Sequence, residues 1–149
     1  MELEPSAFSS DPGEKGFMKF IHDLPVAIFR ETQESRIVYC NKALAELFGF
    51  ASCAELMEYS MSRFYRNEEE RAVLLQAVIK SGLVMEAPVA LKRRDGRPIQ
   101  CRLTARAHLD ECGMLEYVDG VLRDATGDIE RRGNRPTLEN TASVLSDFI

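Results

Sequence analysis

The chain has 149 residues, a formal net charge of −5 and four cysteines without a CxxC pair. This length suits one domain with a hydrophobic core and a tail, and the acidic balance argues against a general nucleic-acid binder, which needs a basic face for the phosphates. No apolar run approaches the roughly 18 residues that span a bilayer, and the two histidines and scattered cysteines form no zinc-ligand pattern. We therefore expect a cytoplasmic protein with reduced thiols, without a metal site, membrane contact or nucleic-acid partner.

Residues 1–14 are rich in proline, serine, glycine and acidic side chains, and this composition predicts a disordered segment. A short helix follows and ends at Pro25. Its apolar residues recur at the spacing of one helix face: Phe17, Phe20, Ile21 and Leu24. This face is a candidate dimer interface; the alternative is that it covers the domain's own sheet.

Two short stretches of β-branched and aromatic residues, 26–31 and 36–41, predict a hairpin. Asn41 is a candidate N-cap for the helix that follows, and Gly49 is a candidate C-cap. A capping box at 52–55, with serine at the cap and glutamate three residues later, predicts a second short helix.

The segment 67–82 has the clearest helical pattern in the chain. Asn67 is a candidate N-cap, three glutamates follow where the helix dipole favours negative charge, and Gly82 closes the helix. The apolar period then changes from near 3.6 to 2, which predicts two strands around a tight turn at Asp95-Gly96. The second of these strands alternates cleanly and places His108 on its polar face.

A fifth strand is predicted over 114–124, and the chain leaves it through Asp124-Ala125-Thr126. The predicted order is helix, two strands, three helices and three strands, which favours an α+β fold with one antiparallel sheet and helices on one face. Asp124 and Thr126 can hydrogen-bond the local backbone where the strand ends. The alternative is that they only terminate the strand.

Four segments in this order resemble the PAS family of sensor domains, over roughly residues 17–132. They are LPVAIFR, RIVYCNKALAELFGF, KRRDGRPIQCRLTARA and VDGVLRDATGDIERR. Asn41 and Gly49 match residues typical of the second segment. Asp124 and Thr126 match the family's Asp-x-Thr exit. Each segment alone is a weak signal, but four in order with the correct spacing are specific.

The resemblance implies a five-stranded antiparallel sheet of order 2-1-5-4-3, with helices on one face enclosing a small apolar cavity. It divides the chain into a disordered segment (1–14), a PAS sensor domain with a leading helix (15–132), and a linker with a short amphipathic helix (133–149). Members of the family detect a ligand, light, oxygen or redox state, or simply dimerise. They pass the change through the last strand to an effector domain, so Asp124 and Thr126 would relay the signal in a homodimer.

Neither covalent flavin nor haem is expected. The flavin photosensors of the family carry a cysteine in a motif resembling Gly-x-Asn-Cys-Arg-Phe-Leu-Gln, and residues 60–64 contain none. Haem-binding members need an axial histidine, but the helix at 67–82 has none, His108 faces away from the cavity and His22 belongs to the leading helix. The cofactor stays open, with a small apolar ligand as the remaining candidate.

Such a ligand would occupy a mostly apolar pocket with Tyr39 as its polar anchor. The alternative is that the same residues form a plain core without room for a ligand. The pocket candidates are Ile28, Tyr39, Leu47, Phe64, Leu75, Leu103 and Val118.

The chain contains no nucleophile–base pattern, phosphate-binding loop or metalloprotease motif, so we do not expect an enzyme. We expect the sensory domain of a bacterial signal-transduction protein, such as a two-component histidine kinase or a diguanylate cyclase or phosphodiesterase. A ligand-free homodimerisation module stays open, as does, more distantly, a small-cavity enzyme. The apolar spacing of 138–148 predicts a short helix that either begins a connecting coiled coil or folds back onto a sheet.

Overall fold

The computed structural model describes residues 12–127. The predicted disorder up to residue 11 and the predicted C-terminal linker and helix lie outside the described residues. The elements, in chain order, are α2 (Pro12–Asp23), β1 (Ala27–Thr32), β2 (Ile37–Cys40), α3 (Lys42–Phe48), α4 (Cys53–Leu56), the 3-10 helix η1 (Met61–Phe64), α5 (Glu68–Ser81), β3 (Leu83–Lys92), β4 (Pro98–Leu109) and β5 (Leu115–Asp124).

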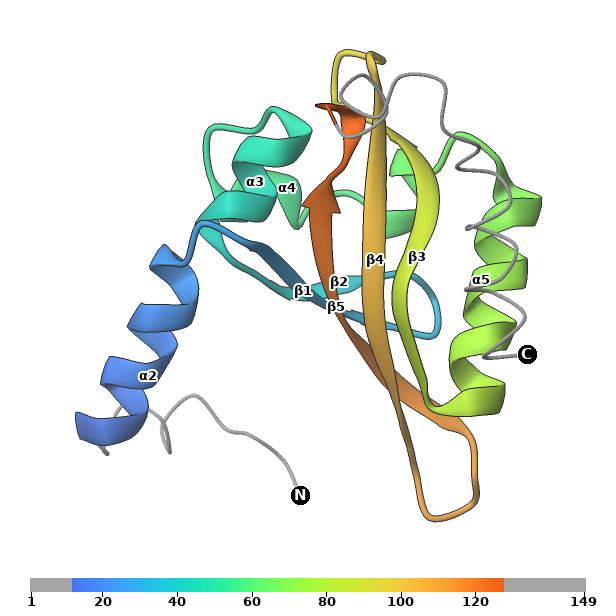
Figure 1. Cartoon of the computed structure of the whole chain (residues 1–149). Coiled ribbons are helices and arrows are strands. Elements are labelled where there is room, and N and C mark those ends of the chain that lie inside the picture. The colour runs from blue at the N-terminus through green and yellow to red at the C-terminus, as the bar shows by residue number, and fades with distance from the viewer. Residues whose placement is uncertain (1–11, 128–149) are drawn as a thin grey trace.

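The five strands form one antiparallel sheet in the order β2-β1-β5-β4-β3, which confirms the predicted order. α3 packs on β1 and α5 packs on β3 and β4, so the core lies between these helices and the inner face of the sheet (Figure 1). α2 departs from this arrangement. It extends away from the other helices (Figure 1) and borders the opposite, outer face of the sheet.

The ends of α3 and α5 follow from local signals in the sequence. Asn41 and Asn67 cap these helices by accepting hydrogen bonds from first-turn N–H groups, which have no partner within the helix. Gly49 and Gly82 end them in the left-handed conformation, with φ of 87° and 83°, which glycine adopts without a steric penalty. The predictions at these four positions are confirmed.

Helix α2 begins at Pro12, so residues 12–14, which we predicted to be disordered, belong to the helix. Proline is favoured at the first helical position because its missing N–H would have no helical partner there. Glu14 adds a favourable negative charge in the first turn. Within residues 12–127, no helix combines the length and the apolar composition needed to cross a membrane.

A bulge in the β1–β2 hairpin decides which side chains of β2 reach the core. Arg30 pairs with Tyr39 and Glu31 pairs with Ile37, so Val38 is an extra residue without a partner. Simple alternation would put Tyr39 on the same face as Ile37. The bulge instead puts Tyr39 opposite Arg30, on the outer face.

The core depends on one close contact between β1 and β5. Phe29 and Gly120 are partners across these strands, and a Cβ added at Gly120 would collide with the Phe29 ring. Glycine therefore provides the flat backbone on which the ring lies. Further along the core, Phe48 and Phe64 stack with their ring centroids 4.5 Å apart.

Candidate functional site

A small inner cavity of about 20 Å³ lies between the sheet and α5. Three of the predicted pocket residues line it: Leu75 from α5, Leu103 from β4 and Val118 from β5. A water molecule needs about 10–15 Å³ of such volume, so the cavity has room for about one water. As the structure describes it over residues 12–127, this cavity is too small for an organic ligand.

The other four pocket candidates lie elsewhere. Ile28 and Tyr39 line a groove on the outer face, because strand alternation and the β2 bulge turn both side chains away from the core. The prediction that they share a pocket with Leu75 is therefore wrong. Phe64 is buried in the aromatic stack and Leu47 packs, partly buried, against the core; neither lines the inner cavity.

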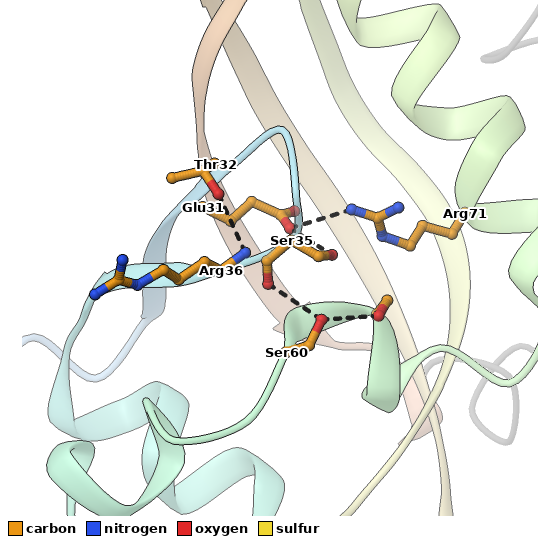
Figure 2. A network of polar contacts seen from close by, with 7 residues as sticks. Glu31, Thr32, Ser35, Arg36, Ser60 and Arg71 are labelled. Carbon is orange, nitrogen blue, oxygen red and sulfur yellow. Dashed lines mark hydrogen bonds and ion pairs between the residues drawn. The ribbon is translucent and has the colours of Figure 1, made fainter.

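The polar end of the inner cavity holds a buried ion pair (Figure 2). Arg71 Nη2 lies 3.5 Å from Glu31 Oε2, and the Ser35 hydroxyl donates to the same oxygen at 3.2 Å. Burial raises the pKa of the Glu31 carboxyl, while the charge of Arg71 and the hydrogen bond from Ser35 oppose this shift. The carboxyl is thus held by two partners in a site that disfavours its charge.

The turn between β1 and β2 ties this ion pair to η1 (Figure 2). The Ser35 carbonyl accepts from the Ser60 hydroxyl at 3.4 Å and from the Met61 N–H at 2.7 Å. Within the turn, the Arg36 N–H donates to Thr32 Oγ1 at 3.3 Å. Hydrogen bonds and the ion pair therefore connect the polar end of the inner cavity to η1.

A larger groove of about 700 Å³ lies between α2 and the outer face of the sheet; we call it the outer groove. Its apolar lining comprises Met18, Ile21, Ile28, Val38, Tyr39, Leu83 and Val121. Beside it, Phe17 and Phe20 are 61% and 59% exposed, while Leu24 is half-buried. The phenylalanines do not cover the domain's own sheet, so that alternative is wrong.

The polar edge of the outer groove is a cluster on β1, β4 and β5. Asp119 accepts from Arg30 Nε at 2.6 Å and lies 3.2 Å from His108 Nε2. Tyr117 stacks on His108, with centroids 4.4 Å apart, and carries the Arg30 guanidinium 3.8 Å above its ring. The hydrogen bond to Asp119 raises the pKa of Arg30. His108 lies on the outer face, as predicted.

Asn41 joins α2 to the core. Its amide group donates to the carbonyls of Ile21 and Val26 at 2.9 and 2.7 Å. Its carbonyl oxygen accepts from the N–H groups of Ile28 and Leu44 at 2.9 and 3.1 Å. One fully buried side chain therefore fixes the last turn of α2, the start of β1 and the start of α3 relative to one another.

Hydrogen bonds hold the residues at the end of β5, 124–126, against β4. Thr126 Oγ1 accepts from the Gln100 N–H at 3.1 Å, and the Ala125 N–H donates to the Gln100 carbonyl at 2.7 Å. Asp124 Oδ1 accepts from the Thr126 N–H at 2.9 Å. The expected hydrogen bond of Asp124 to the local backbone is confirmed, whereas the Thr126 hydroxyl bonds the backbone of β4 instead.

Two of the cysteines have buried thiols with raised pKa values. Cys40 and Cys101 are buried, and burial raises the pKa of each thiol to about 12. Because the thiolate is the reactive form, burial disfavours reaction at either sulfur at neutral pH.

Comparison with known proteins identifies the fold. A family model described as PAS fold matches residues 17–125. The chain belongs to the PAS family. The search of curated proteins found no match to this sequence.

Solved PAS domains share this architecture. The PAS domain of a protein from Colwellia psychrerythraea has a TM-score of 0.67 at 18% identity, covering 76% of this chain and 97% of that chain. A PAS domain from a two-component sensor histidine kinase has a TM-score of 0.64 at 13% identity, covering 77% and 98%. The PAS domain of a LuxR-family transcriptional regulator from Burkholderia thailandensis, in complex with ethanol, has a TM-score of 0.61 at 23% identity, covering 72% and 96%. At these identities the likeness shows the fold alone.

Sequence reasoning missed the buried ion pair of this PAS domain. Strand alternation puts Glu31 on the same face as Ala27 and Phe29, which face the core. A carboxylate at such a position was the one signal in the sequence that could have indicated a buried charge. Arg71 follows three glutamates at a helix start, which resembles an ordinary solvated face. No local pattern connects residues forty positions apart.

Proposed function

We propose that this PAS domain is a sensory module that relays a stimulus through β5 to an effector domain in a longer, cytoplasmic bacterial signalling protein. The observation that carries the proposal is the set of hydrogen bonds that hold the end of β5 against β4. Because Ala125 and Thr126 are bonded to Gln100 on the neighbouring strand, sliding of β5 against β4 would change the direction in which the chain leaves. The similarity to PAS domains of a sensor histidine kinase and a transcriptional regulator supports this role.

We further propose that the module acts as a homodimer through α2 and the outer groove. The exposed rings of Phe17 and Phe20 lie beside the apolar lining of the outer groove. Contiguous apolar surface that is exposed on a domain marks an interaction site. A two-fold axis would let α2 of each copy cover the groove of the other, since such an interface uses the same surface twice. Burying Phe17 and Phe20 would then remove their rings from water, which is worth about 25 cal/mol per Å² of apolar surface.

Asn41 supports a link between this interface and the core. A change in the position of α2 would act on β1 and α3 through the hydrogen bonds of Asn41. β1 in turn pairs with β5 along its whole length. The proposed signal therefore has a continuous path from the dimer interface to the exit at Thr126.

The second candidate is a ligand-free dimerisation module. The small inner cavity favours it, because a ligand in the core would require the side chains around Leu75 and Leu103 to move apart. Under this reading the stimulus is a change in the partner or in a neighbouring domain. The two candidates share the same interface and the same exit.

The interface is tested by light scattering on Phe17→Glu combined with Phe20→Glu. Both side chains are exposed in the single chain, so the double variant should fold and give a monomer where the wild type gives a dimer. Val73→Glu is the matched control: Val73 is 56% exposed, on α5 away from the outer groove, and should leave the dimer intact. A double variant that stays dimeric, or a monomeric wild type, would contradict the proposal.

A further inference from the structure

A third hollow, of about 330 Å³, opens at the tip of the β3–β4 hairpin, and it shares no residue with the inner cavity. The loops before and after α4, the helix η1 and the hairpin border it. Its lining combines aromatic rings with cationic side chains: Phe50, Tyr59, Arg63, Phe64, Lys92, Arg93, Arg94 and Gly96. We call it the hairpin pocket.

The hairpin pocket is positively charged in an acidic protein. Four of its lining residues are cations, whereas the chain as a whole has a net charge of −5. Within residues 12–127, Arg94 is the only one of the four with a carboxylate partner, Glu55, at 3.0 Å. The other three bring uncompensated positive charge to one hollow, where it would attract an anion.

Two of the guanidinium groups lie over aromatic rings, and Arg63, unlike Arg94, has no carboxylate partner among residues 12–127. Arg63 lies 5.0 Å over the Tyr59 ring and Arg94 lies 4.7 Å over the Phe50 ring. Stacking of this kind engages the face of the guanidinium and leaves its edge free to donate. These ring contacts thus order the side chains of Arg63 and Arg94 before a ligand binds, and a binding site that is ordered in advance loses less entropy on binding.

The hairpin backbone is also fixed at the pocket. The Arg94 N–H donates to the Phe48 carbonyl at 2.8 Å, and the Arg93 N–H donates to the Arg97 carbonyl at 2.8 Å. Arg93 passes over Gly49, where an added Cβ would lie 3.4 Å from its Nη2. The cations therefore converge from two rigid parts of the fold.

We propose that the hairpin pocket binds a small organic phosphate of the size of a sugar phosphate or a mononucleotide. Arginine forks match the oxygens of a phosphate, and charge-assisted hydrogen bonds of this kind are the strong ones. The volume lies at the lower end of the range for small-molecule sites, which excludes larger cofactors. This inference goes beyond the proposed relay function, because it gives the domain a ligand site outside its core.

The test is calorimetric titration of the full chain with ribose 5-phosphate and with adenosine monophosphate, alongside adenosine and inorganic phosphate. We expect saturable binding of the two esters, weaker binding of inorganic phosphate and none of adenosine. Arg63→Gln combined with Arg93→Gln should weaken ester binding by at least roughly tenfold. Arg97→Gln is the matched control, because Arg97 lies on the same hairpin outside the pocket and should leave binding unchanged.

Amide chemical shifts of the wild-type chain supply a measurement that needs no variant. The esters should shift residues of η1 and of the β3–β4 turn, and little else. Absence of saturable binding, shifts centred on another region, or equal weakening in Arg97→Gln would overturn the proposal. So would inorganic phosphate binding as tightly as the esters, since the site would then recognise a simple anion.

Discussion

Asn41→Ala tests how the leading helix is attached to the domain. Loss of the cap at Leu44 costs about 1 kcal/mol, and each further buried group left without a partner costs about 1–3 kcal/mol. Two such groups remain, the Val26 carbonyl and the Ile28 N–H, whereas the Ile21 carbonyl still accepts from the Leu24 N–H at 3.3 Å. Val26 is exposed, so water can replace part of what is lost there. We expect the free energy of unfolding to fall by about 2–4 kcal/mol, a large share of the total for a small domain.

Urea unfolding followed by far-UV circular dichroism measures this loss, because the chain has no tryptophan to report by fluorescence. Asn67→Ala is the matched control. Asn67 caps α5 in the same way, but it is exposed and bonds only the N–H groups of Glu69 and Glu70. Its removal should cost about 1 kcal/mol. Equal losses in the two variants would refute the role assigned to the buried amide.

Three further predictions follow from the core and the exit. Gly120→Ala should cost about 1–3 kcal/mol in the same assay, because its Cβ displaces the Phe29 ring; unchanged stability would contradict the close packing. Burial raises the pKa of Glu31, so the native state binds the extra proton. The free energy of unfolding of the wild type relative to Glu31→Gln should therefore be highest at a pH below the ordinary pKa of the carboxyl. It should fall as the pH rises through the raised pKa of Glu31 in the folded state; a difference independent of pH would disprove this linkage. Thr126→Val should speed amide exchange at Gln100 with little loss of stability, and unchanged exchange would argue against a fastened exit.

The fold was predictable from local signals that agree with one another. Asn41 and Gly49 set the ends of α3 because their side chains and φ angles suit caps, and Asp95-Gly96 sets the β3–β4 turn. The order of the strands in the sheet came from the family resemblance, since strand periodicity fixes faces and not neighbours. The leading helix α2 differed in two ways. It starts at Pro12, because proline occurs both in disordered segments and in first helical turns, and it borders the outer face of the sheet instead of the face that the other helices cover.

The candidate site was predictable only in part. Leu75, Leu103 and Val118 follow the periods of their elements and meet at the inner cavity. Tyr39 was misplaced because one bulged residue reverses the faces that follow it, and no sequence pattern marks the bulge at Val38. Local sequence patterns also could not predict contacts between distant segments, such as the ion pair of Glu31 and Arg71.

The central proposal, a dimeric relay, is tested most directly by native mass spectrometry. The freshly purified wild-type chain is compared with the same sample after denaturation, and with Arg63→Gln combined with Arg93→Gln. The proposal predicts a dimer, and any mass released on denaturation should be absent from the double variant because it occupied the hairpin pocket. A monomer would contradict the proposed relay, and a retained molecule that persists in the double variant would contradict its assignment to the hairpin pocket.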